Sequence, residues 1–85
     1  MRVLLIEDEQ RLARYVKKGL EEHNFAVDIA SDGETGLFSV SENEYDVIVL
    51  DLLLPKKDGL TVLQELRAGG DQAPVLILTA RDALA

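Results

Sequence analysis

The chain has no cysteine and no tryptophan, and only two of its 85 residues are prolines. The lack of cysteine excludes disulfides and cysteine-ligated zinc. Long hydrophobic runs are also missing, because a charge or a proline interrupts every apolar run after a few residues, far short of a membrane span. Met1 and Arg2 lead into the first apolar run without a signal-peptide pattern. We therefore expect a cytoplasmic protein with no membrane partner.

Basic residues are scarce: nine stand against sixteen acidic ones, for a formal net charge of -7. This balance opposes binding to a phosphate backbone, and the pairs Lys17–Lys18 and Lys56–Lys57 are too isolated to form a basic stripe. We expect no nucleic acid to be bound by this chain itself. A hydrophobic share of 47% is typical of a single globular unit. A unit of 85 residues buries a small share of its surface, which predicts marginal stability or support from a partner.

Strand-like and helix-like segments alternate along the chain. Val47 to Leu50 is apolar on both strand faces, which is typical of a central parallel strand, whereas the interrupted pattern of Ala26 to Ala30 favours an edge strand. Two further strands are predicted over residues 3–6 and 75–78. The predicted order βαβαβαβ implies right-handed crossovers and a mostly parallel α/β sheet.

Apolar residues at helical spacing predict the three helices between these strands. The first extends from Arg11 to His23, the second begins at Asp32–Gly33, and Gly69–Gly70 ends the third. Their inward positions are predicted at Leu12, Val16, Leu20, Leu37, Val40, Leu60, Leu63 and Leu66. Tyr15 and Tyr45 are interpreted as packing residues, and His23 as a surface histidine.

Acidic residues end two of the predicted strands. Asp51 closes the run Val47 to Leu50, and Glu7, Asp8 and Glu9 follow the first strand. If these strands are parallel neighbours, their carboxylates meet at the edge of the sheet where open α/β folds bind ligands. Carboxylates crowded there repel one another unless a hard cation lies between them. The pattern predicts a divalent-metal site.

Each of these residues also has a simpler interpretation. The acidic triplet alone is more often a set of solvated loop acids, or acids that favour a helix amino terminus. Asp51 alone could be an ordinary residue at the end of a strand, and Thr79 alone is more often a helix cap than a ligand. The combination on adjacent strands favours the metal site over these alternatives.

Three motifs in the matching strand positions resemble the receiver domain of bacterial two-component response regulators. They are Glu7–Asp8, Asp51 with Leu54–Pro55 and Asp58–Gly59, and Thr79–Ala80. The resemblance covers the whole chain and is greatest to OmpR/PhoB-type regulators, which implies a flavodoxin-like (CheY-like) fold. It also implies that residues 1–85 form a single, partial receiver domain that stops after the fourth strand, with no output domain.

The resemblance implies a role for each site residue. Asp51 would accept a phosphoryl group from a sensor histidine kinase, and Thr79 would contact a phosphoryl oxygen. Mg²⁺, with Mn²⁺ as an alternative, would be held by Asp8, by Asp51, by the Leu53 backbone carbonyl and, through water, by Glu7. The chain would be a phospho-acceptor that assists its own phosphorylation, not a turnover enzyme.

The resemblance also implies that the family's phosphoryl-binding lysine lies beyond Ala85, so we expect slow phosphotransfer by this chain. The alternative function is a self-associating receiver fragment with an interaction role. Val75 to Leu78 would form an apolar edge, which predicts a homodimer through the fourth strand. An aspartyl-phosphate hydrolase is disfavoured, because Leu53 occupies the position of the second acid that it requires.

Overall fold

A computed structural model describes residues 1–54 and 57–78 of the chain. Strands and helices alternate in the predicted order. The elements are β1 (Arg2–Ile6), α1 (Gln10–Glu21), β2 (Ala26–Ala30), α2 (Gly33–Glu42), β3 (Val47–Asp51), α3 (Gly59–Ala68) and β4 (Val75–Leu78). None of the helices in the described ranges is long and apolar enough to cross a membrane.

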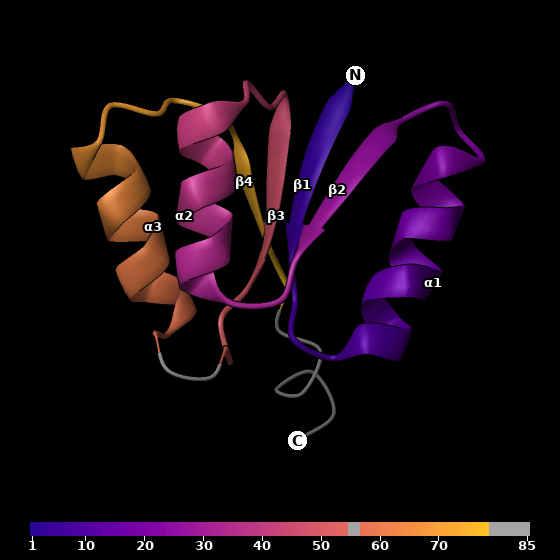
Figure 1. Cartoon of the computed structure of the whole chain (residues 1–85), viewed down its shortest axis with the longest axis horizontal. Helices are drawn as coiled ribbons and strands as arrows, with labels where there is room; N and C mark the ends of the chain where they lie inside the picture. The colour runs from indigo at the N-terminus through magenta and orange to yellow at the C-terminus, as the bar shows by residue number, and fades with distance from the viewer. Residues whose placement is uncertain (55–56, 79–85) are drawn as a thin grey trace.

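The strands form one parallel sheet in the order β2-β1-β3-β4. This arrangement confirms the predicted flavodoxin-like class, with β2 at one edge and β3 in the interior. One helix lies in each connection between consecutive strands, as the parallel direction of the strands requires. The carboxyl ends of β1 and β3 therefore lie at the same end of the sheet, at the bottom of Figure 1.

The helices cover the sheet from both sides, with α1 on one face and α2 and α3 on the other (Figure 1). The alternation of side chains along the strands separates the core into two clusters. The core on the α1 face contains Val3, Leu5, Ala13, Val27 and Val49. The core on the α2–α3 face contains Leu4, Ile6, Ala30, Tyr45, Ile48, Leu50, Leu54, Val62 and Leu66.

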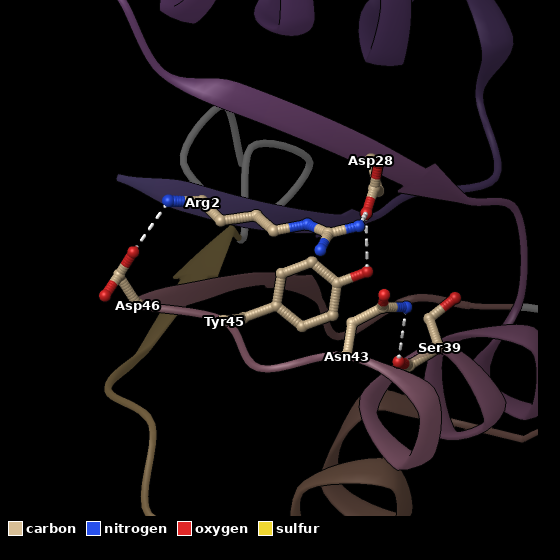
Figure 2. A network of polar contacts seen from close by, with 6 residues as sticks. All are labelled: Arg2, Asp28, Ser39, Asn43, Tyr45 and Asp46. Atoms are coloured by element: carbon tan, nitrogen blue, oxygen red, sulfur yellow. Dashed lines mark hydrogen bonds and ion pairs between the residues drawn. The ribbon is translucent and has the colours of Figure 1, made fainter.

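Polar contacts around Arg2 join three segments that lie far apart in the sequence (Figure 2). Arg2 Nη2 forms an ion pair of 2.9 Å with Asp28 Oδ2, and its guanidinium carbon lies 5.3 Å from the centre of the Tyr45 ring. The Arg2 backbone N–H donates to Asp46 Oδ2 at 2.7 Å. This network connects β1 to β2 and to the segment that enters β3.

Two expectations about side-chain burial are wrong. Tyr15 is 78% exposed on α1, so it is not a packing residue, whereas Tyr45 is buried as predicted. Leu60 is 60% exposed at the start of α3, because Val62 and Leu66 form the fully buried positions of that helix. An i, i+3, i+6 pattern of leucines drifts around a helix with 3.6 residues per turn, so the side of α3 that packs into the core includes Leu63 and Leu66 but not Leu60.

Apolar side chains are exposed on β4, which lies at the edge of the described sheet. Leu76 is 60% exposed and Ile77 is 37% exposed. Successive residues of a strand point to opposite faces, so apolar surface lies open on both faces beside β4.

Candidate functional site

The sheet register places two acids side by side. Ile6 on β1 pairs with Leu50 on β3, so Glu7 and Asp51 follow at the same level of adjacent strands. The Glu7 backbone N–H donates to Ala30 O at 3.0 Å, which continues the pairing with β2 past the end of β1. Both acids are buried, with 4% of Glu7 and 7% of Asp51 exposed. The predicted meeting of acids at the carboxyl edge is therefore present.

Asp8 completes a cluster of three carboxylates. One oxygen from each of Glu7, Asp8 and Asp51 lies within 4.8 Å of the other two. Carboxylate oxygens at this spacing are the ligands that hard divalent cations such as Mg²⁺ prefer. Among residues 1–54 and 57–78, these three acidic side chains are close enough together to hold one metal ion.

The Asp8 side chain supports a cation at this position. Its Oδ1 atom is buried and has no hydrogen-bond partner among the described residues. A buried carboxylate oxygen without a partner is costly, and a bound cation would remove that cost. The residues present therefore fit the divalent metal that the resemblance implies.

Glu7 responds to the same crowding. The pKa of its carboxyl is raised to about 7, chiefly by burial and further by the nearby charge of Asp51, against the opposing hydrogen bond from the Glu9 backbone. The Glu9 N–H donates to Glu7 Oε2 at 2.9 Å. In the metal-free chain, burial and the adjacent acids therefore favour the protonated form of Glu7.

Glu9 has a different role from its two neighbours. It is the N-cap of α1, and its side chain accepts hydrogen bonds from the backbone N–H groups of Arg11 at 3.1 Å and Leu12 at 2.7 Å. The simpler interpretation of the triplet is correct for this one residue, which satisfies free N–H groups at the helix start. The metal-site interpretation fits Glu7 and Asp8.

The segment after β3 fixes the Asp51 carboxylate. The backbone N–H of Leu53 donates to Asp51 Oδ1 at 3.0 Å. Sequence reasoning did not predict this contact, although an aspartate commonly accepts a hydrogen bond from the backbone N–H two residues later. The bond orients the carboxylate, and the Leu53 carbonyl belongs to the same turn.

Several motif residues, and one of the two lysines after β3, lie outside the described ranges. Thr79 and Ala80 lie outside the described residues, as do Pro55 and Lys56. Lys57 is described, and its Nζ forms an ion pair of 2.7 Å with Glu65 on α3. Its charge is therefore paired with an acid of α3 and not with the acid cluster.

The fold and the acid cluster define a class of protein, and comparison with known proteins identifies it. Residues 3–85 match the family described as the response regulator receiver domain. The chain belongs to this family and is a receiver domain of the two-component response-regulator type. The family's members act as phospho-acceptors.

Curated relatives are transcriptional regulators of the OmpR/PhoB type. The chain is 51% identical over 84 residues to the transcriptional regulatory protein QseB of Haemophilus influenzae, covering 99% of the chain and 38% of that protein. It is 43% identical over 81 residues to the transcriptional regulatory protein PcoR of Escherichia coli, covering 95% of the chain and 36% of that protein. The chain thus spans little more than a third of the length of these relatives.

Solved receiver domains share the fold. The receiver domain of a sensor histidine kinase of Pseudomonas aeruginosa, which has a magnesium ion coordinated in its active site cleft, superposes with a TM-score of 0.86 at 31% identity, covering 93% of this chain and 66% of that one. The response regulator TrrA of Thermotoga maritima, in complex with Mg²⁺ and BeF, superposes with a TM-score of 0.85 at 29% identity. The match covers 94% of this chain and 71% of that one.

Proposed function

We propose that Asp51 accepts a phosphoryl group from the phosphohistidine of a sensor histidine kinase. Mg²⁺ would be held by Asp8, Asp51 and the Leu53 carbonyl, with Glu7 reaching it through water. The observation that carries this proposal is the cluster of three carboxylates within 4.8 Å, which includes a buried Asp8 oxygen without a partner. Two of the solved relatives contain magnesium, which supports the choice of ion.

The proposed reaction is an in-line phosphoryl transfer. An oxygen of the Asp51 carboxylate forms the new bond to phosphorus while the bond from phosphorus to the histidine nitrogen breaks, and the leaving imidazole takes up a proton. The product is an acyl phosphate. When bound, Mg²⁺ supplies positive charge that offsets the charge on the transferring group. The Leu53 N–H keeps the Asp51 carboxylate in one orientation before the donor arrives.

The environment of the cluster matches this chemistry. Glu7 and Asp51 are both buried, so their charges act in a region with little water. Burial and, to a smaller extent, the charge of Asp51 raise the pKa of Glu7, so the charged form of this carboxyl is disfavoured without a cation. A bound Mg²⁺ would offset the repulsion between the carboxylates and favour the ionised form of Glu7.

Phosphorylation of the wild-type chain by phosphoramidate tests the proposal, because this small donor has a phosphorus–nitrogen bond like that of phosphohistidine. Intact-mass spectrometry should show one added phosphoryl group that depends on Mg²⁺ and is lost in Asp51→Asn. Asp46→Asn is the matched control, because Asp46 is an exposed acid that directly precedes β3. It therefore lies at the amino end of the strand that Asp51 ends. Unaltered labelling of Asp51→Asn would contradict the proposal.

Several finer predictions from the sequence accompany this proposal. Slow labelling, binding of Mn²⁺ in place of Mg²⁺, a cytoplasmic location and a homodimer through β4 stay predictions. A role for a longer parent protein as a transcription regulator is supported by the names of the relatives. Under this proposal the described domain supplies the phospho-acceptor, and DNA binding belongs to another part of such a parent.

A further inference from the structure

Gly59 is the first residue of α3 and lies against the turn that follows Asp51. A Cβ atom at this position would lie 2.6 Å from the Leu52 Cα and 2.7 Å from the Asp51 carbonyl oxygen. Both are backbone atoms, so a side-chain rotation cannot relieve the contact. Gly33 and Gly36 also lack space for a Cβ, but there the nearest atoms belong to the side chains of Val62 and Ile6.

A short chain of hydrogen bonds connects Gly59 to the Asp51 carboxylate. The Gly59 N–H donates to the Leu52 carbonyl at 3.1 Å. The next residue, Leu53, donates its own N–H to Asp51 Oδ1 at 3.0 Å. The start of α3 therefore holds the backbone of the turn, and the turn holds the carboxylate that the proposed reaction uses.

The other side of the contact cannot move easily. Asp58 Oδ1 accepts from the Thr61 N–H at 2.9 Å and caps α3. Val62 and Leu66 on the same helix are buried in the core. Buried packing fixes α3, and strand pairing fixes Asp51 at the end of β3. A Cβ at residue 59 would therefore displace residues 52 and 53, which belong to neither element.

We propose that Gly59 is a positioning residue for the Asp51 site. Its lack of a side chain lets α3 hold the turn so that the Leu53 N–H keeps the Asp51 carboxylate in the cluster with Glu7 and Asp8. This inference rests on the proposed function, because it assumes that these groups bind the metal. A site of this kind requires its ligands to be held within about 0.5 Å, less than the displacement that a contact of 2.6 Å demands.

Magnesium titration of Gly59→Ala tests the inference. The full 85-residue chain would be titrated with MgCl₂ and followed by backbone amide NMR, with urea unfolding measured on the same samples. We expect Gly59→Ala to bind Mg²⁺ about tenfold more weakly, a loss typical when a group that orients a metal ligand is changed. The Leu53 amide resonance should shift in the metal-free state.

Gly33→Ala is the matched control, because it places the same methyl group against Val62 on α3 and not against the turn. It should lower stability and leave the Mg²⁺ affinity unchanged. Equal affinities for wild type, Gly59→Ala and Gly33→Ala would overturn the inference. The inference would also be overturned if both variants lost Mg²⁺ affinity in proportion to their loss of stability. Absence of Mg²⁺ binding by the wild type would instead reject the proposed function.

A pair of variants at Asp58 keeps the inference testable if Gly59→Ala does not fold. Asp58→Ala and Asp58→Ser remove the same charge, but serine still provides an oxygen that caps α3. The alanine variant should loosen the start of the helix at Gly59 and bind Mg²⁺ more weakly than the serine variant. Equal Mg²⁺ affinities in this pair would show that the start of α3 does not position the site.

Discussion

The hydroxyl of Tyr45 donates a hydrogen bond of 2.7 Å to Asp28 Oδ2, the same oxygen that pairs with Arg2. Asp28 lies on β2 and Tyr45 precedes β3, and these two strands are separated by β1 in the sheet. The contact therefore spans a strand and connects the edge of the sheet to its interior. It is independent of the acid cluster and is a target for stability measurements.

Tyr45→Phe should lower the free energy of unfolding by about 1 kcal/mol, because it removes a hydrogen bond to a charged acceptor while the ring remains packed. The Asp28 side chain is 43% exposed, so solvent screening keeps the loss below the usual range for charged partners. Urea unfolding would measure it. Tyr15→Phe is the matched control, since Tyr15 is largely exposed, and it should change stability little. Equal losses in the two variants would contradict the role of the hydroxyl.

Stability should depend on acid pH through Asp28. The Tyr45 hydrogen bond, assisted by Arg2, holds the pKa of the Asp28 carboxyl below its usual value of 3.8. A carboxyl whose pKa is lower in the folded chain stabilises it fully above pH 3.8, and that contribution is lost as the pH falls through the lower pKa. The stability difference between wild type and Asp28→Asn should therefore shrink from pH 6 to below pH 3. A constant difference measured by urea unfolding over that range would refute this expectation.

Removal of either direct metal ligand should weaken magnesium binding. Asp8→Asn and Asp51→Asn should each lower the Mg²⁺ affinity by about tenfold or more, because each removes one negative ligand. Asp8→Asn should also stabilise the metal-free chain by relieving repulsion within the cluster. Calorimetric titration and urea unfolding would measure the two effects.

Glu9→Gln is the control for that experiment. It removes a charge from the same triplet, but the amide oxygen of the introduced glutamine can still cap α1, and the wild-type side chain faces Arg11 and Leu12. Its Mg²⁺ affinity should stay close to that of the wild type. A loss as large as that of Asp8→Asn would mean that general negative charge, and not the cluster, attracts the ion.

The homodimer predicted from the sequence can be tested at β4. Leu76 is more exposed than Ile77, so Leu76→Lys should dissociate a dimer formed through this edge with less damage to the monomer fold than Ile77→Lys. Leu60→Lys is the matched control, because Leu60 is also 60% exposed but lies on α3. Sedimentation equilibrium would compare these variants with the wild type. A wild type that is monomeric at high micromolar concentration would reject the dimer.

The sequence was sufficient to predict the order of the elements and the meeting of Glu7, Asp8 and Asp51. Apolar runs that are covered on both faces, such as Val47–Leu50, have few alternatives to a central parallel strand, and the end of such a strand fixes where Asp51 lies. Strand order and parallel pairing then bring the acids together. These features depend on patterns that extend over whole elements.

Features that depend on a single side chain or a short contact were not predicted. Tyr15 is an aromatic residue of the kind that usually packs in a core, but its position on α1 leaves the side chain exposed to solvent. The bond between Tyr45 and Asp28 joins residues 17 positions apart in the sequence, which no local pattern reports. The close approach of Gly59 to the Asp51 turn likewise exists only once α3 packs on the sheet.

The N-cap at Glu9 has a consequence for how the acidic triplet tolerates substitution. Its two hydrogen bonds require an acceptor oxygen at that position, not a negative charge. In a library that randomises all three positions, selection for folding and for phosphorylation together would retain serine, threonine, asparagine or aspartate at position 9, since these are the preferred capping residues. Positions 7 and 8 would retain carboxylates. Three consecutive acids that look alike would thus separate into one exchangeable position and two restricted ones.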